Sequence, residues 1–281
     1  MPVTYPARGL QRILAGSVDP DLRVTLYGQD GDAVDAGGTL TCSIARADGT
    51  VIATDRATTD AAGLGAYTCS LTTTEALTLD VLVATWRISG VTRATSHHRI
   101  VGGFLFTTDE LGQLAGVGDD FDRAQLRKAR DEITDLVEWY CGAQNARYDL
   151  EVFEGHGGDR RGLAHRPVLS VRSVTIDDTT VDVSTLDVNH AAGIVRGVTF
   201  AGQCQVGYEH GLYSPDFDLK RAALTAAADT LTRDRGTIGS RVRSISDGMG
   251  VTQQFSYAGD GHPTGIDEVD AVIMAKALAR I

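Results

Sequence analysis

The residues of this 281-residue chain that could bind a metal or catalyse a reaction are few and poorly spaced. Histidines occur as the pair His97-His98 and as His156 and His165, but none has a carboxylate or cysteine at a metal-ligand spacing. We therefore predict exposed or strand-edge histidines and no bound metal. The segment Gly155–Gly162 superficially resembles a phosphate-binding loop, yet it lacks a closing Lys-Ser/Thr and a following helix. It is predicted to be a surface loop.

Other signatures of catalysis are absent from the sequence. There is no Gly-x-Ser-x-Gly motif, and the Asp-Gly pairs that begin at 30, 48, 247 and 260 are typical of turns rather than calcium loops. The carboxylates of the segment 119–141 alternate with arginines, which favours a solvated or intersubunit face over acid–base catalysis. We expect neither a catalytic centre nor a cofactor, and hence no enzyme activity.

The four cysteines are predicted to be buried small side chains. Cys42, Cys69, Cys141 and Cys204 form no Cys-x-x-Cys pair and no zinc spacing with histidine. The N-terminus lacks a basic segment followed by an apolar stretch, so we expect no signal peptide and a protein that folds in the cytoplasm. In that compartment buried thiols are more common than disulfides.

The net charge of −11 argues against a protein that grips DNA by its phosphates. Residues 1–100 hold 8 basic and 10 acidic side chains, and the remainder holds 18 and 27. Acid is therefore concentrated in the second part, which would repel or guide DNA. No apolar run approaches the roughly 20 residues that a membrane span requires.

The first part of the chain shows the alternating apolar pattern of β-strands. The expected strands are Leu22–Tyr27, Thr39–Arg46, Val51–Asp55, Gly63–Leu71, Val81–Ser89 and Val91–Arg99. Six or seven strands at this spacing, without a helical period, predict a small immunoglobulin-like β-sandwich. Trp86 is its expected core residue. Because the Cys…Trp…Cys pattern of antibody domains is missing, the prediction concerns architecture only.

Three helices and a β insertion are predicted after residue 118. The helix 119–141 has apolar residues at helical spacing, aspartates at its start and Gly142 at its end. Short strands then fill 148–209. The helix 215–235 should begin with Ser214 as its cap, and its apolar stripe is mostly alanine, which allows close approach of another helix.

The C-terminal segment is predicted to be an arm followed by a last helix. Gly236–Pro263 has no core-like period, and ordered segments of this length usually contact something. Thr264 should cap the last helix, with Asp267 in capping-box position. The side chains expected to be buried by that helix are Ile266, Val269, Ile273, Ala277 and Leu278.

These patterns predict an α+β protein of two domains: an N-terminal immunoglobulin-like β-sandwich, then a helical domain with an inserted small β-sheet and a long C-terminal arm. The expected divisions are 1–106 for the N-terminal extension and sandwich, 107–118 for a linker, 119–236 for the helical domain and 237–281 for the arm and last helix.

Several segments resemble the head–tail connector (adaptor) proteins of long-tailed bacteriophages. The segments that carry the resemblance are ITDLVEWYCG (133–142), RPVLSVRSVTID (166–177), VGYEHG (206–211), SPDFDLKRAALTAAADTL (214–231) and SRVRSISDG (240–248). The front part is similar to versions from phages of actinobacteria, through RADGTV (46–51), YTCSLT (67–72) and the bridge IVGGFLF (100–106). The resemblance covers nearly the whole chain, but it includes no diagnostic motif.

The resemblance implies a virion protein at the head–tail interface, assembled in the host cytoplasm. Such proteins form a ring of identical subunits, usually a dodecamer, beneath the portal protein. The ring extends the DNA channel without binding DNA specifically and receives the next head-completion (stopper) or tail protein. No membrane is involved.

Two sets of contact residues are expected for such a ring. The candidate portal or partner contacts are Arg241, Arg243, Gln253, Phe255, Ile266, Val269 and Ile273. The candidate contacts between subunits are Arg127, Arg130, Asp131, Asp135, Glu138, Ala222 and Ala226.

A second interpretation is a virion or cell-surface module whose β-sandwich binds carbohydrate or a host surface. Sugar platforms use exposed aromatic rings. Both tryptophans, Trp86 and Trp139, lie on predicted apolar faces, which argues against this alternative.

Overall fold

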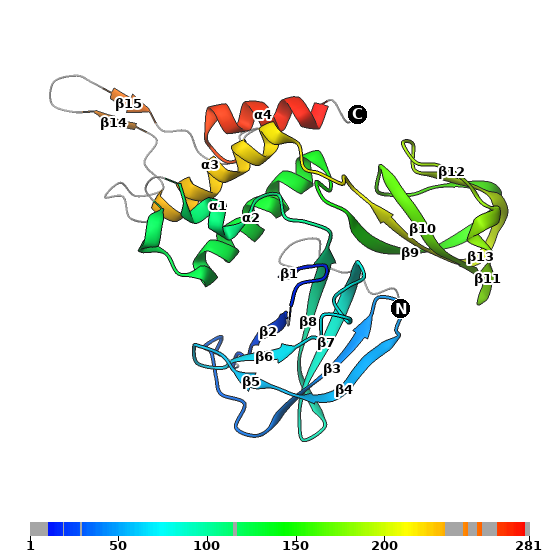
Figure 1. The fold of residues 1–281 in the computed structure, drawn as a ribbon, viewed down its shortest axis with the longest axis horizontal. Helices are drawn as coiled ribbons and strands as arrows, with labels where there is room; N and C mark the ends of the chain where they lie inside the picture. The colour runs from blue at the N-terminus through cyan, green and yellow to red at the C-terminus, as the bar shows by residue number, and fades with distance from the viewer. Residues whose placement is uncertain are drawn as a thin grey trace. The chain divides into compact units, whose positions relative to one another are not determined.

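The computed structural model is a mixed α+β protein, as predicted (Figure 1). The structure describes residues 11–18, 20–28, 30–114, 117–233, 244–246, 252–254 and 263–278. The chain divides into two compact units: unit 1 is Met1–Gly103 with Asn145–Tyr213, and unit 2 is Phe104–Gln144 with Ser214–Ile281.

Unit 1 is built from two sheets. The small sheet has the order β2-β6-β5 and contains β2 (Asp21–Thr25), β5 (Thr59–Asp60) and β6 (Ala66–Ser70). The large sheet has the order β11-β10-β13-β9-β8-β7-β3-β4, with β1 paired to β8 and β12 to β13. Its strands are β1 (Gln11–Leu14), β3 (Leu40–Arg46), β4 (Val51–Ala57), β7 (Asp80–Ile88), β8 (Val91–Val101), β9 (Arg147–Gly162), β10 (Val168–Ile176), β11 (Thr179–Val181), β12 (Asp187–Asn189) and β13 (Ile194–His210). Apart from the parallel β1–β8 pair, its ladders are antiparallel.

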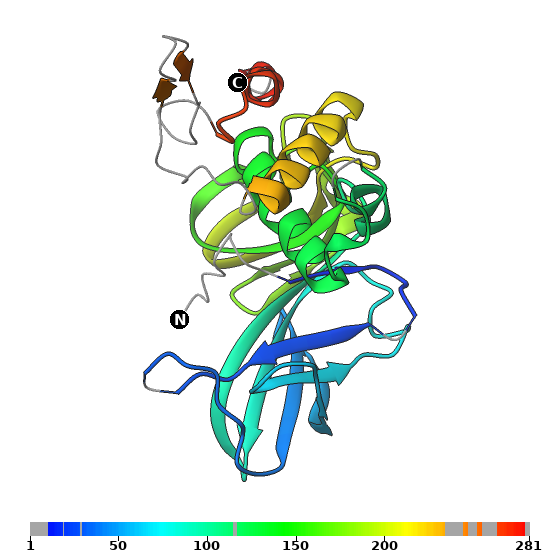
Figure 2. The same ribbon diagram turned by 90° about the vertical axis from the view of Figure 1, so that its left-hand side faces the viewer.

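The first part of unit 1, residues 11–103, is here called the front module. Its core lies between the small sheet and strands β8, β7 and β3, which face each other in both views (Figures 1 and 2). Alternation places Cys42 and Ile44 of β3 on the same face as Trp86 of β7, and all three are buried. The six strands predicted here are present with shifts of a few residues, whereas β1 was not predicted.

Residues 145–213 form the rear module, whose organising feature is the long pairing of β9 with β13. The register runs from His210↔Arg147 to Ile194↔Gly162, with irregular pairing around Phe200. The predicted surface loop at Gly155–Gly162 was wrong, because this segment belongs to β9, and β9 and β13 are longer than the short strands expected over 148–209. The glycines of this segment suggested a loop, but in the structure glycine lets two strands approach closely. A Cβ atom at Gly155 would lie 2.6 Å from the backbone of Phe200 in β13.

Unit 2 contains the helices α1 (Thr108–Gly112), α2 (Arg123–Cys141), α3 (Phe217–Arg233) and α4 (Asp267–Leu278), and the short 3-10 helix η1 (Gly118–Asp120). A second 3-10 helix, η2 (Val183–Thr185), belongs to unit 1, and β14 (Ser244–Ser246) pairs with β15 (Thr252–Gln254) within the predicted arm. Helix α3 lies between α2 and α4 (Figure 1), and each of these three helices packs on the other two. Residues 107–118, predicted to be a linker, include α1, and Leu111 and Val117 enter the helical core.

The helix caps agree with the sequence for α2 and differ for the two later helices. Asp122 accepts hydrogen bonds from the backbone N–H of Ala124 and Gln125, and Gly142 ends α2 with a φ of 77°. Helix α3 is capped by Asp216 rather than Ser214, because its Oδ1 accepts from the N–H groups of residues 218 and 219. Before α4, Thr264 bonds to Asp270 rather than Asp267.

Five of the residues predicted to contact another subunit or the portal are buried within unit 2. Ala222 and Ala226 of α3 pack in the cluster shared with α2 and α4, and Val269 and Ile273 of α4 join the same cluster. Arg130 is also buried, with its guanidinium 3.7 Å from the ring centroid of Phe104. The burial of Val269 and Ile273 by the last helix was predicted, whereas the alanine face of α3 is covered by helices of the same chain.

We expect Ala226→Leu to lower the free energy of unfolding by about 1–3 kcal/mol, because added methylene groups overpack a close helix contact. Ala226 is only 2% exposed. Chemical denaturation of the full chain measures the change. Ala124→Leu on the exposed first turn of α2 is the matched control. Equal stabilities for the two variants would show that the helix contact at Ala226 can accommodate a leucine side chain without overpacking.

Among the described residues, no helix is both long enough and apolar enough to cross a membrane.

Candidate functional site

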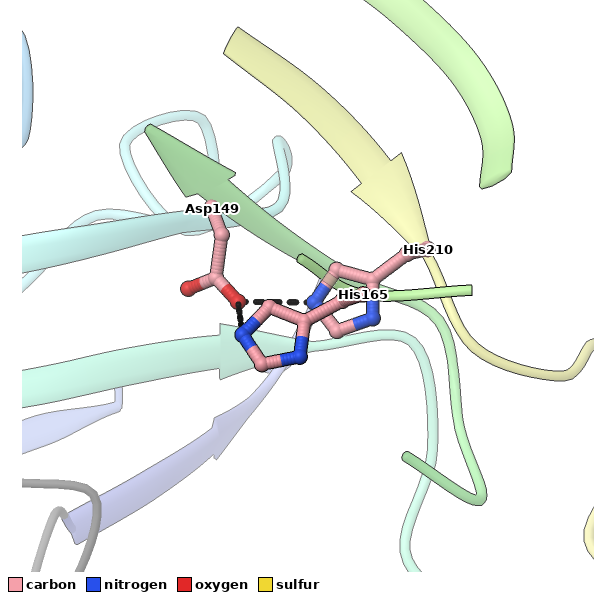
Figure 3. Close-up of side chains that lie close together, drawn as sticks. All are labelled: Asp149, His165 and His210. Atoms are coloured by element: carbon pink, nitrogen blue, oxygen red, sulfur yellow. Dashed lines mark hydrogen bonds and ion pairs between the residues drawn. The ribbon is translucent and has the colours of Figure 1, made fainter. Parts of the chain in front are cut away.

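Three titratable side chains gather in the rear module, although they lie far apart in the sequence. Asp149 is in β9, His210 is at the end of β13, and His165 is in the connection from β9 to β10. In the β9–β13 register Asp149 lies opposite Tyr208, so His210 is its diagonal neighbour on the same face of the sheet. Figure 3 shows both imidazole rings directed at one oxygen of the Asp149 carboxylate.

The distances define a compact N,N,O cluster. His210 Nε2 is 2.7 Å and His165 Nε2 is 3.6 Å from Asp149 Oδ2. The two imidazole rings stack, with centroids 4.6 Å apart and an interplanar angle of 15°. The side chain of His210 is 1% exposed, that of Asp149 18% and that of His165 42%, so His165 is the member that solvent reaches most easily.

The surroundings keep the two histidines neutral and Asp149 ionised at neutral pH. Burial lowers the pKa of His210 to about 4, and burial also lowers the pKa of His165. Burial alone would raise the pKa of Asp149, but the hydrogen bond with His210 and the charges of Arg99 and Arg147 outweigh it and leave this pKa below its usual value.

Neighbouring side chains fix the position of each member. Arg99 Nη2 donates to Asp149 Oδ1 across 3.3 Å, which leaves Oδ2 facing the histidines. The backbone N–H of His165 donates to Tyr208 Oη at 3.2 Å, and Tyr208 Oη in turn donates to Glu151. The connection that carries His165 is thus fastened to both long strands.

The chemistry of this cluster suits ligand binding better than catalysis. His210 is too deeply buried to exchange a proton with a bound substrate, and its Nε2 is occupied by Asp149. Two imidazole nitrogens and one carboxylate oxygen are, however, common ligands of transition-metal ions. The ligand atoms of all three residues lie within 4.8 Å of one another.

Sequence reasoning missed this cluster, because only the β9–β13 register brings its members together. His165 had been considered with His156, which is exposed in β9 and is not part of the cluster. His98 had been predicted to be exposed or at a strand edge, but it is 1% exposed in β8 between β1 and β7. The only local signals were polar residues within the apolar patterns of YDLEV and VGYEH.

The remaining predicted contact residues have mixed placements. The four charged residues of α2 on the predicted subunit face, Arg127, Asp131, Asp135 and Glu138, are all partly buried. Ile266 is partly buried against the core of unit 2. Arg241, Arg243 and Phe255 lie outside the described residues, and Gln253 is described only as part of β15, paired with Ile245.

The structure adds three exposed apolar residues at one end of the helices of unit 2. Trp139 is 62% exposed near the end of α2, Phe217 75% at the start of α3 and Leu278 67% at the end of α4. These helix ends are neighbours, because Lys276 Nζ is 2.6 Å from Asp216 Oδ2 and Cys141 Sγ is 3.4 Å from the carbonyl oxygen of Ile273. The predicted burial of Trp139 and Leu278 was therefore wrong.

The cysteines of the front module are buried, as predicted. Cys42 in the large sheet and Cys69 in the small sheet are 0% and 1% exposed, and Cys204 is buried in the rear module. Cys141 is partly buried against α4.

Comparison with known proteins does not assign this chain to a family: no protein-family model matches it, and no curated protein matches it.

Proposed function

We propose that this chain is a head-to-tail connector of a long-tailed bacteriophage. Identical subunits, twelve in the ring expected from the resemblance, surround the DNA channel beneath the portal protein and receive the next stopper or tail protein. In this proposal the front module is an immunoglobulin-like sandwich on the outer rim, unit 2 is the core of the connector domain, and residues 237–263 are the arm. The protein acts in the virion as a structural component and not as an enzyme.

The observation that carries the proposal is the resemblance of several segments in the same order along the chain. They fall on α2, β10, the end of β13, α3 and the arm. Support comes from the core of unit 2, in which α2 and α3 pack together although the rear module separates them in sequence. A connector domain interrupted by a β insertion needs this arrangement.

The charge distribution supports a channel through which DNA passes without specific binding. Unit 1 contains 14 basic and 19 acidic residues, and unit 2 contains 12 and 18. Both units are therefore acidic, whereas a protein that holds DNA by its phosphates concentrates basic residues. Like charges on the channel wall keep DNA mobile.

We assign the contact between subunits to the exposed end of unit 2 formed by Trp139, Phe217 and Leu278, together with the charged face of α2. Interfaces combine a few large apolar side chains with surrounding charged groups. The occupant of this surface is a second copy of the chain, since a closed ring repeats one contact between identical subunits.

The expected result is that purified full-length protein forms rings, alone or on portal-bearing particles, and that Phe217→Asp with Leu278→Asp abolishes them. Two carboxylates placed in an apolar contact lose their hydration without gaining partners. Mass photometry and negative-stain microscopy measure ring formation, while circular dichroism checks that the variant is folded.

Val91→Asp, at an exposed β8 position of the front module, is the matched control and should leave the rings intact. A wild-type protein that stays monomeric even with portal present would contradict the connector function. Rings that survive the double substitution would contradict only the assigned surface.

The alternative, a carbohydrate- or host-binding sandwich, has less support. Among the described residues of the front module, Tyr27 is the exposed aromatic residue, while Tyr67 and Trp86 are buried. One isolated ring is a poor platform for stacking on a sugar.

A further inference from the structure

We propose that Asp149, His165 and His210 bind one divalent transition-metal ion, with Zn²⁺ the expected ion. This inference does not depend on the proposed function. Two imidazole nitrogens and one carboxylate oxygen form a ligand set that Zn²⁺ uses when a fourth position is left for water or another ligand. The partial exposure of His165 provides the route by which an ion enters from solvent.

The distances from Asp149 Oδ2 to the two imidazole nitrogens are close to those that an ion requires. Ligand atoms about 2.0–2.1 Å from a tetrahedral Zn²⁺ lie about 3.3 Å from one another. The two distances from Asp149 Oδ2, 2.7 Å to His210 and 3.6 Å to His165, lie on either side of that value. Both rings present Nε2 to the same carboxylate oxygen (Figure 3), but they are stacked at an interplanar angle of 15°. A bound ion lies in the plane of each ring, so the ring of His165, which is outside the strands and partly exposed, must turn out of the stack for both nitrogens to reach one centre.

A metal requires each imidazole to offer an unprotonated nitrogen. His210 Nε2 is hydrogen-bonded to Asp149 Oδ2 at 2.7 Å, so binding an ion at this nitrogen replaces that hydrogen bond. The neutral imidazoles need only carry their proton on Nδ1 to offer Nε2 to the ion.

Neighbouring residues both support the site and limit its affinity. Arg99 holds Asp149 through Oδ1, and Tyr208 holds the backbone of His165, which fixes two ligands from behind. Arg99 and Arg147 also bring positive charge close to the ion, and Arg147 Nε lies 3.3 Å from His210 Nε2. Since these charges repel a cation, we expect micromolar rather than nanomolar affinity.

The test is a calorimetric titration of tag-free, chelator-treated full-length protein with Zn²⁺. Wild-type protein should bind one equivalent, and His165→Ala should weaken binding at least tenfold, because one of three protein ligands is lost. His165 is chosen because it lies outside the strands and is partly exposed, so its removal leaves the Asp149–His210 pair in place. His156→Ala, which removes an exposed histidine outside the cluster, should bind like wild type.

Two further measurements make the test specific. Co²⁺ should give the visible absorption of a four-coordinate ion with wild-type protein, and this signal should be lost with His165→Ala. Arg147→Gln should tighten Zn²⁺ binding, because it removes a nearby positive charge. Absence of Zn²⁺ binding up to millimolar concentration, or equal affinity in wild type and His165→Ala, would overturn the proposal.

Discussion

Replacing Trp86 with alanine should lower the free energy of unfolding by about 3–5 kcal/mol, the range for removing a large aromatic side chain from a packed core. Trp86 is fully buried between the two sheets of the front module. Its Nε1–H also donates to Ser96 Oγ at 2.8 Å, so the variant loses a partly buried hydrogen bond in addition to its packing. Urea denaturation of the full chain, followed by circular dichroism, measures the loss.

Tyr27→Ala is the matched control for this experiment. Tyr27 is a 66% exposed aromatic residue of the front module, so its truncation should change stability by about 0.5 kcal/mol or less. If Trp86→Ala cost no more than Tyr27→Ala, the front module would not depend on the core between its two sheets.

Acid should destabilise the front module through His98, even though this residue makes no ion pair among the described residues. His98 is buried, its Nε2 lies 2.7 Å from Ser96 Oγ, and its Nδ1 has no hydrogen-bond partner within the described structure. Burial lowers the pKa of His98 to about 3, with a smaller contribution from His97. The charged imidazolium is thus excluded from the folded state.

The direction of the pH dependence of stability follows from the difference in proton binding between the folded and unfolded chains. In the unfolded chain His98 takes up a proton below pH 6.5, whereas in the folded chain it does so only near pH 3, so stability is complete above pH 6.5 and is lost as the pH falls toward 3. Between pH 7.5 and 5 this histidine alone should cost about 2 kcal/mol, and over the whole window about 5 kcal/mol.

His98→Gln isolates this contribution, because glutamine does not titrate. The other histidines with lowered pKa, including His97, His165 and His210, contribute to the pH dependence of both proteins and cancel in the comparison. We expect the stability of wild type relative to His98→Gln to decrease by about 2 kcal/mol from pH 7.5 to pH 5. A constant difference across this range would mean that His98 is hydrated in the folded protein.

Local patterns predicted the elements whose signals are contained within a few residues. Alternating apolar residues placed the front-module strands, and the apolar spacing of α2, with Asp122 before it and Gly142 after it, gave that helix and its ends. The local pattern predicted the wrong capping residue for α3, where two polar residues that can cap a helix lie close together. Asp216 replaced Ser214 as the cap of α3, since the final choice depends on which backbone N–H groups the side chain can reach.

These patterns could not predict which segment of the protein packs against each apolar helix face. The alanine face of α3 was correctly recognised as suited to close helix packing, but the packing helices belong to the same chain. Conversely, Phe217 and Leu278 lie at helix ends, where periodicity does not specify a neighbour. Which apolar residues are covered depends on how separate segments pack together.

The sequence alone determined an acidic α+β chain with a β-rich front part and helices after it, because composition and periodicity are properties of short stretches. Only the tertiary structure decided that Asp149, His165 and His210 meet and that Ala222 and Ala226 are internal. Pairing of β9 with β13, and packing of α3 between α2 and α4, join residues that are distant along the chain. Such contacts are fixed by register and by the burial of whole surfaces, which no local stretch of sequence encodes.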